Sequence, residues 1–202
     1  MYKHCFIGIL ISCCSILLYN CSEKPDHEDT ANFTKADSVT DTYLQFQDSI
    51  LAVWNEMISD DNLKIDAMHD VLHELQISGS VEQDEIKSYE ERLQQLKQSR
   101  YTQKTMANED IIQEYDFASN SLVSELISLA ESQRQFAYNS TLQKLVDNIR
   151  LADQRVNNYR AEYDRITMEY NDFVENNKEI LDDTNSDSTL VKKPLFQVAT
   201  EE

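Results

Sequence analysis

The chain has 202 residues, a formal net charge of −19, and only two glycines and two prolines. Sheet and barrel folds need turn residues every ~8–12 positions, but Gly79 is the only glycine or proline between residues 36 and 182. The composition therefore argues against those folds and predicts an all-helical protein. The acidic surface repels phosphate backbones, which argues against nucleic acid as a partner.

The N-terminus has the pattern of a secretory signal. All four cysteines lie within residues 1–21, so none can form a disulfide or a thiolate metal site in the body of the chain. An apolar run over residues 5–19 follows Lys3 and His4, and it is shorter than the roughly 20 residues that span a bilayer. The run ends in Leu18-Tyr19-Asn20-Cys21, which resembles the cleavage site of a bacterial lipoprotein. We therefore expect residues 1–20 to be a signal peptide and Cys21 to be lipidated.

Two alternatives to this processing stay open. Leu10-Ile11-Ser12-Cys13 also matches the lipoprotein pattern, although few apolar residues precede it. The second alternative is that the apolar run remains uncleaved as an anchor helix.

Ser22 resembles the residue choice that permits sorting to the outer membrane. We therefore expect a lipid-anchored protein of the bacterial cell envelope, in the outer membrane rather than the inner one, facing the periplasm or the cell surface.

Residues 21–40 are polar and acidic, with Phe33 as their only large apolar side chain before Val39. Such a segment buries too little apolar area to offset its chain entropy, so it predicts a flexible tether.

Residues 41–182 are expected to form the helical body. The first helix begins near Thr40 or Asp41 and ends before Gly79, a residue suited to a left-handed helix end. Apolar spacing of three and four predicts its packed face. That face comprises Leu44, Gln47, Leu51, Trp54, Ile58, Asp61, Ile65, Met68, Leu72 and Leu75.

Three further helices follow. A capping box at Ser80 and Gln83 opens the second, which bends near residues 102–108, and the third extends to about Phe136. A second capping box, at Ser140 and Gln143, opens the fourth, which extends to about Leu181. Its packed face is the most regular in the chain: Leu142, Leu145, Ile149, Ala152, Val156, Tyr159, Tyr163, Ile166, Tyr170, Phe173, Asn177 and Ile180.

Short connections place neighbouring helices antiparallel. The expected fold is therefore an all-α, elongated antiparallel four-helix bundle. Residues 183–202 are expected to be a flexible C-terminal tail, with a short apolar segment from Leu190 that lies back against the bundle.

The fourth helix carries a motif that resembles the C-terminal helix of the LemA family. Three parts of the motif stand at the family's spacings: Asp153-Gln154-Arg155-Val156, Arg160-x-x-Tyr163-Asp164 and Tyr170-Asn171. Asp164 stands where the family has an asparagine. Upstream, Trp54 and the segment 63–72, which includes Asp66, stand at the matching distance, although the family's arginine pair is lost. Lys193-Pro194-Leu195-Phe196 is similar to the family's tail.

The resemblance implies a membrane-anchored bacterial protein with a long helical bundle, here with a lipid anchor in place of the usual N-terminal helix. The family has no agreed enzymatic activity, so the resemblance supplies no catalytic residue. The motif residues are expected to be structural or to take part in interactions: Trp54, Asp66, Arg155, Arg160, Tyr163, Tyr170 and Asn171.

An enzyme remains an alternative hypothesis because His69 and His73 lie four residues apart with Asp70 between them. This spacing is similar to a helical zinc-protease motif, which has glutamate where this chain has Asp70. The only other histidine after residue 21 is His27, so the sequence offers no evident third ligand. A metal-dependent hydrolase using His69 and His73 is the alternative, but we expect no metal or other cofactor.

The sequence thus favours a non-enzymatic, LemA-like lipoprotein that is held to the membrane by its N-terminal lipid. It would act as a scaffold or interaction module for an unidentified envelope protein. A self-assembling coiled-coil rod is a second alternative, because amphipathic helices of this length also pair between copies.

Overall fold

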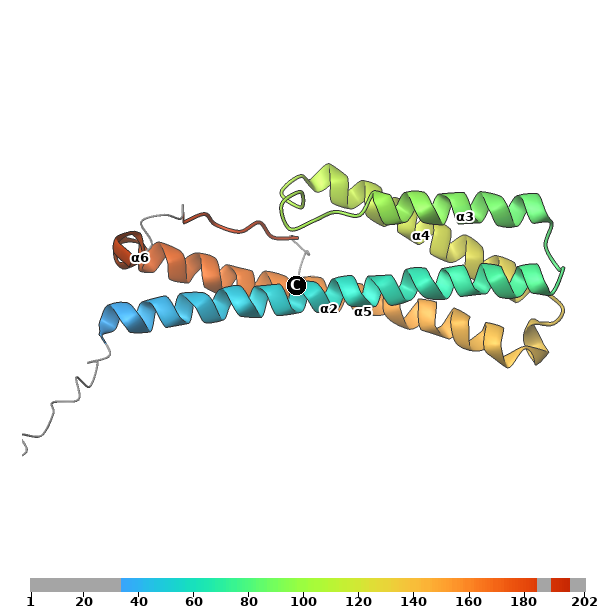
Figure 1. Ribbon diagram of the computed structural model, residues 1–202, viewed down its shortest axis with the longest axis horizontal. Coiled ribbons are helices and arrows are strands. Elements are labelled where there is room, and N and C mark those ends of the chain that lie inside the picture. The colour runs from blue at the N-terminus through green and yellow to red at the C-terminus, as the bar shows by residue number, and fades with distance from the viewer. Residues whose placement is uncertain (1–33, 185–189, 197–202) are drawn as a thin grey trace, which may run out of the picture. The chain divides into compact units, whose positions relative to one another are not determined.

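The computed structural model describes residues 34–184 and 190–196 (Figure 1). All regular structure in these residues is helical, which confirms the all-α class. No helix in this part of the chain is long and apolar enough to cross a membrane. The expected signal peptide and Cys21 lie outside the described residues. The elements are α2 (Lys35–Ile77), α3 (Gln83–Gln98), α4 (Glu109–Ser132), the 3-10 helix η1 (Phe136–Tyr138), α5 (Ser140–Asn176) and α6 (Lys178–Thr184).

Helix α2 begins at Lys35, so the expected tether is wrong in its last residues. Val39 and Tyr43, in the first turns of the helix, are both buried. The ring centroid of Tyr43 lies 5.9 Å from that of Tyr170 in α5. Burial of these apolar groups offsets the entropy cost of ordering the first turns, which the polar composition alone did not suggest.

The most extensive helix contact is between α2 and α5, which lie side by side (Figure 1). Along this contact, higher residue numbers in α2 meet lower residue numbers in α5. Helix α3 packs on α2 and α4, and α4 also contacts α2 and α5. The pairs that show the order along α2 and α5 are Tyr43 with Tyr170, Trp54 with Tyr163, and Lys64 with Asp153.

Before Trp54, which is buried as expected, α2 packs through residues other than the expected leucines. Leu44 and Leu51 are 52% and 50% exposed, whereas Tyr43 and Phe46 lie against the aromatic rings of α5. Aromatic rings bury more apolar area than leucine, and this selects the face that turns inward. The second half of the expected face is buried as predicted, from Ile65 onward.

The helix ends show which polar residues act as caps. Gly79 has φ +61, which fits the predicted left-handed end of α2. Ser80 does not cap α3, because the N-cap residue is Glu82 and makes no side-chain cap bond. Asn139, not Ser140, caps α5 by accepting a hydrogen bond from the Leu142 N–H at 3.0 Å. Both predicted capping boxes are therefore wrong, the second by one residue.

A break at Asn177 divides the expected fourth helix into α5 and α6. The Asn177 Nδ2 donates to the carbonyl oxygen of Phe173 at 2.9 Å, and the Asn177 backbone N–H donates to the same oxygen at 3.1 Å. Side-chain bonding to the carbonyl four residues back competes with helix continuation. Leu181 of α6 is fully buried, so the expected boundary at residue 182 falls inside a packed helix.

Residues 190–196, which we call the strap, have no helical structure and run back along α5 (Figure 1). The backbone of Lys193 meets Asn171, and the backbone of Phe196 meets Asp164. The apolar segment that was expected to lie back against the helices therefore does so.

Candidate functional site

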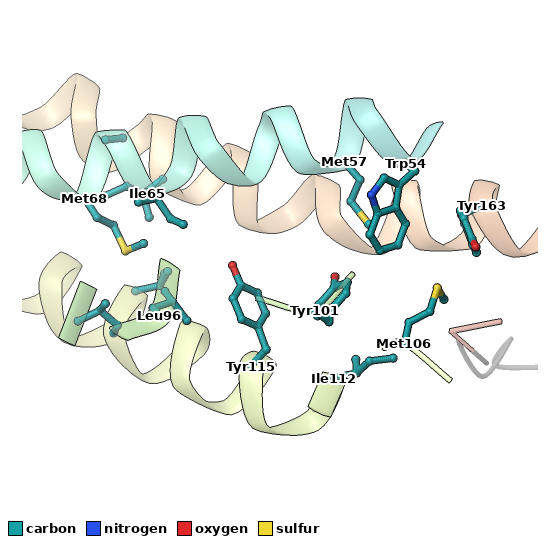
Figure 2. Close-up of a cluster of buried hydrophobic side chains, with 14 of the residues drawn as sticks. Trp54, Met57, Ile65, Met68, Leu96, Tyr101, Met106, Ile112, Tyr115 and Tyr163 are labelled. Atoms are coloured by element: carbon teal, nitrogen blue, oxygen red, sulfur yellow. The ribbon is translucent and has the colours of Figure 1, made fainter. Parts of the chain in front are cut away.

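The strap and α2, α4 and α5 meet around a buried aromatic cluster. Figure 2 shows Trp54 and Met57 of α2 pointing toward Tyr101, Met106 and Tyr115. Tyr101 and Met106 come from the connection between α3 and α4, yet they are only 5% and 2% exposed. This connection is the stretch that was predicted to bend, and it ends at Asn108, whose side chain accepts from the Asp110 N–H at 3.1 Å. Its apolar side chains fill the space that opens where α3 ends.

A buried lysine lies beside this cluster. Lys64 of α2 is 4% exposed, and its ammonium nitrogen donates to the hydroxyl of Ser119 in α4 at 2.9 Å. The same nitrogen lies 3.2 Å from a carboxylate oxygen of Asp61 and 3.7 Å from one of Asp153. A buried charge is tolerated only when it is paired and hydrogen-bonded. Lys64 meets this condition through partners on three helices.

Asp61 also binds two groups from outside α2. Its Oδ2 accepts from the Tyr115 hydroxyl at 2.6 Å and lies 2.7 Å from a guanidinium nitrogen of Arg100. Burial and the nearby Asp61 carboxylate raise the pKa of Tyr115 well above its ordinary value. Tyr115 therefore remains a hydrogen-bond donor to Asp61 through the whole neutral range.

Arg160 of α5 completes the polar side of the site. Its guanidinium donates to both carboxylate oxygens of Asp116 in α4, at 2.7 and 2.6 Å, and to the Tyr101 hydroxyl at 3.0 Å. Burial by itself lowers the pKa of Arg160, but the hydrogen bonds to Asp116 and Tyr101 outweigh it and raise the pKa. The two-pronged contact fixes the spacing of α4 and α5.

Arg155, five residues earlier on α5, pairs with the buried Asp60 of α2. Arg155, Lys64, Arg100 and Arg160 thus face four aspartates, at positions 60, 61, 116 and 153. Opposite charges are therefore balanced inside a protein whose surface is strongly acidic.

A cavity of about 30 Å³ lies within this network and is bordered by Lys64, Tyr115 and Arg160. That volume suits about one water molecule. The Nε atoms of Arg100 and Arg160 have no hydrogen-bond partner among the described residues. On the outside, an open groove of about 380 Å³ between α4 and α5 is lined by side chains that include Asn120 and Asn157. The groove offers hydrogen-bond donors and acceptors, but its carboxylates are already paired with cations.

The strap is held to α5 through its main chain. The Asn171 Nδ2 donates to the Lys193 carbonyl oxygen at 2.9 Å, and the Asn171 Oδ1 accepts from the Lys193 N–H at 2.8 Å. About two turns earlier on α5, the Asp164 Oδ1 accepts from the Phe196 N–H at 2.7 Å. These three bonds satisfy backbone groups that an extended segment beside a helix would otherwise leave unpaired.

The Phe196 ring fills a pocket in the aromatic cluster. Its centroid lies 6.3 Å from that of Trp54, with the planes 10° apart, and 5.4 Å and 5.7 Å from those of Tyr163 and Tyr101. The guanidinium carbon of Arg160 stands 5.0 Å from the Phe196 centroid. Arg160 therefore joins the polar network to the strap, because it contacts both Asp116 and Phe196.

The structure brings most of the sequence-predicted residues together and leaves three apart. Trp54, Arg160, Tyr163, Tyr170 and Asn171 all lie at the core or at the strap. Asp66, His69 and His73 are exposed on α2. The side chain of His69 is 65% exposed and lies 3.7 Å from Asp70. In the described residues, no group of three His, Cys, Asp or Glu side chains is placed to hold a metal ion.

Sequence reasoning missed Lys64, Arg100, Tyr101 and Asp116 as site residues. One signal was present: Asp61 stands at an inward position of an otherwise apolar face, and a carboxylate there needs a buried partner. The partners of Asp61 lie 39 and 54 positions away, at Arg100 and Tyr115. Helical spacing within one segment cannot identify them.

In comparisons with known proteins, no family model matches the sequence, and no curated protein or solved structure matches it.

Proposed function

We propose that this protein is a lipid-tethered, LemA-like helical interaction module of the bacterial cell envelope. The observation that carries the proposal is the position of the residues that resemble the LemA motif. Trp54, Arg160, Tyr163 and Tyr170 are buried, and Asn171 binds the strap backbone. These side chains hold the helices and the strap together. Their positions therefore support a scaffold role.

The helical body is proposed to be an antiparallel four-helix bundle formed by α2, α3, α4 and α5. The opposite order of contacting residues along α2 and α5 supports this arrangement. A short connection of residues 78–82 between α2 and α3 is also compatible with it. In this arrangement, Arg160 joins α5 to α4 through Asp116, which is a structural role of the kind that the resemblance implies. Asp164 stands where the family has asparagine, and it accepts a hydrogen bond from the strap as an asparagine oxygen could.

The tether is proposed from the sequence pattern at Cys21. Two acyl chains hold a protein stably at a membrane, and a tethered protein meets membrane-bound partners at a raised effective concentration. A rigid acidic body on such a tether is suited to bind an envelope protein that carries a basic surface. No catalytic step is part of the proposal.

Site-specific photocrosslinking in the native bacterium tests the proposal. A photoreactive residue placed at Phe117 or Tyr138, which are 79% and 92% exposed, samples two surfaces of the body. We expect a discrete crosslinked product at one position and its loss in Cys21→Ser, which keeps its signal peptide and lacks the acyl chains needed for transfer to the outer membrane. An unchanged product in the Cys21→Ser variant would contradict the tethered role. Absence of a product at either position, and at further exposed positions in each helix, would contradict the interaction role.

A further inference from the structure

The contacts of the strap have the form of peptide recognition. Asn171 and Asp164 bind main-chain atoms of Lys193 and Phe196. In recognition of extended peptides, main-chain hydrogen bonds supply affinity, and pockets for individual side chains supply specificity. Here the pocket for Phe196 is built by Trp54 and Tyr163, together with a tyrosine from the α3–α4 connection.

Two lysines of the strap are also recognised. The Lys193 ammonium stands 5.5 Å from the centroid of the Tyr170 ring, and Lys192 pairs with Glu175 at 2.6 Å. The bound segment is therefore defined by basic residues followed by an aromatic residue three positions after Lys193.

The strap is bound less completely than a helix of the core. All seven of its residues are at least partly exposed. An open cavity of about 200 Å³ lies beside Pro194 and Leu195, between them and Met106. The strap is thus held by a small set of separable contacts, which is the condition for its exchange with another segment.

We propose that this surface is a peptide-binding site that the chain occupies in cis with residues 190–196. In trans, it accepts an extended basic segment of another protein that carries an aromatic residue three positions after a lysine. The site comprises Asp164 and Asn171 for the main chain, Trp54, Tyr101 and Tyr163 for the aromatic side chain, and Tyr170 with Glu175 for the basic side chains.

Charge favours a foreign basic segment as the occupant. The chain carries 37 acidic residues against 18 basic ones, so its field attracts cationic partners and raises their association rate. The connected strap competes at an effective concentration on the order of millimolar. Only molecules with an undocked strap can bind a partner, so the apparent affinity equals the intrinsic affinity multiplied by the fraction of such molecules. The strap therefore acts as an internal competitor that sets a threshold for the partner.

This inference rests on the proposed interaction role, but its test uses neither membrane nor tether, so the two can fail separately. The probe is a fluorescent synthetic peptide with the sequence of residues 190–196. Its anisotropy is measured with the full chain in detergent, as wild type and as Phe196→Ala. We expect the variant, whose strap has lost its anchoring ring, to bind the peptide at least about 10-fold more tightly than wild type. A peptide with alanine in place of its phenylalanine should lose at least about 10-fold.

The matched control is Tyr138→Ala, which removes an aromatic ring that is 92% exposed and should bind as wild type does. Equal binding by wild type and Phe196→Ala would overturn the proposal, as would no binding to a Phe196→Ala protein with an unchanged circular dichroism spectrum. If Phe196→Ala does not fold, Lys193→Ala replaces it for strap release, because it removes the strap ammonium from the Tyr170 ring and leaves the site residues intact. In that variant, the peptide should bind only when its phenylalanine is present. Equal binding of the peptide with and without its phenylalanine would overturn the proposal.

A concentration-dependent dimer of the wild type that Phe196→Ala abolishes would identify a second copy as the occupant and overturn the foreign-partner proposal.

Discussion

The side-chain amide of Asn171 pairs with the backbone of Lys193 through one donated and one accepted hydrogen bond, at 2.9 and 2.8 Å. A single side chain thereby replaces the two main-chain partners that the strap residue would have in a sheet. The pair links α5 to a segment 22 positions further along the chain. Asn171 therefore supplies two of the three hydrogen bonds that α5 makes to the strap backbone.

Asn171→Ala is predicted to release the strap before the helices unfold. Loss of both bonds should cost about 1–3 kcal/mol, because the Lys193 backbone groups are left without partners where they remain buried. Trp54 is the only tryptophan of the chain and stacks on Phe196, so its fluorescence reports strap docking. In urea, its emission should shift to longer wavelength before helical circular dichroism falls. The control is Asn158→Ala on an exposed face of α5, and coincident transitions in Asn171→Ala would contradict the prediction.

Lys64→Met is predicted to destabilise the protein by about 3 kcal/mol, because removing one partner leaves the partly buried Asp61 and the buried Ser119 incompletely paired. Asp61 keeps Arg100 and Tyr115, which limits the loss. The matched control is Lys87→Met: Lys87 is 70% exposed and lies 3.9 Å from Glu91, and its change should cost less than about 1 kcal/mol. Equal urea midpoints for the two variants would contradict the prediction, because Lys64 would then contribute no more stability than the exposed Lys87.

The stability of the protein is predicted to fall steeply above pH 10, the ordinary pKa of tyrosine. Burial and Asp61 raise the pKa of Tyr115 in the folded state. At high pH the unfolded chain therefore loses a proton that the folded chain keeps. This contribution to stability is fully present below pH 10 and is lost at up to about 1.4 kcal/mol per pH unit above it.

The Tyr115→Phe variant isolates this contribution. Its free energy of unfolding, measured between pH 8 and pH 11, should depend less steeply on pH than that of the wild type. Tyr138→Phe is the control, since its ring is 92% exposed, and it should follow the wild-type slope. Parallel curves for wild type and Tyr115→Phe would show that Tyr115 titrates alike in both states.

A fourth prediction concerns His69 and His73, the basis of the alternative enzyme. Both are exposed on α2, and we expect the purified full chain to contain less than one zinc ion per molecule after dialysis against zinc and then buffer. Elemental analysis measures the metal content. Stoichiometric zinc in the wild type that is lost in His73→Ala would contradict the scaffold account and revive the hydrolase.

The sequence was sufficient to predict the helical class and the inward face of α5 and α6, along which none of the twelve expected residues is exposed. Regular spacing over many turns makes that prediction robust. It failed at the start of α2, where leucines and aromatic residues offer two competing faces, and only the rings of α5 decide between them. Asn177 also ends α5 through a local side-chain bond that apolar spacing does not reveal.

The site was predictable where its residues belong to the motif in α5, and not where they come from other segments. Arg160 was identified from the motif, but its partner Asp116 lies 44 positions earlier and is one of many acidic residues. In the sequence, Phe196 stands out only as part of a terminal pattern. Its pocket requires Trp54 and Tyr163 to come together, which is a tertiary event without a local signature.

Metabolic labelling with a fatty-acid analogue tests most directly whether this helical interaction module is anchored to the membrane through lipid at Cys21. The wild type and Cys14→Ser should incorporate the label and mature to the same mass, with the new N-terminus at residue 21. Cys21→Ser should remain unlabelled and unprocessed. Labelling of Cys21→Ser at the wild-type level, or a wild-type protein that carries no label, would contradict the account.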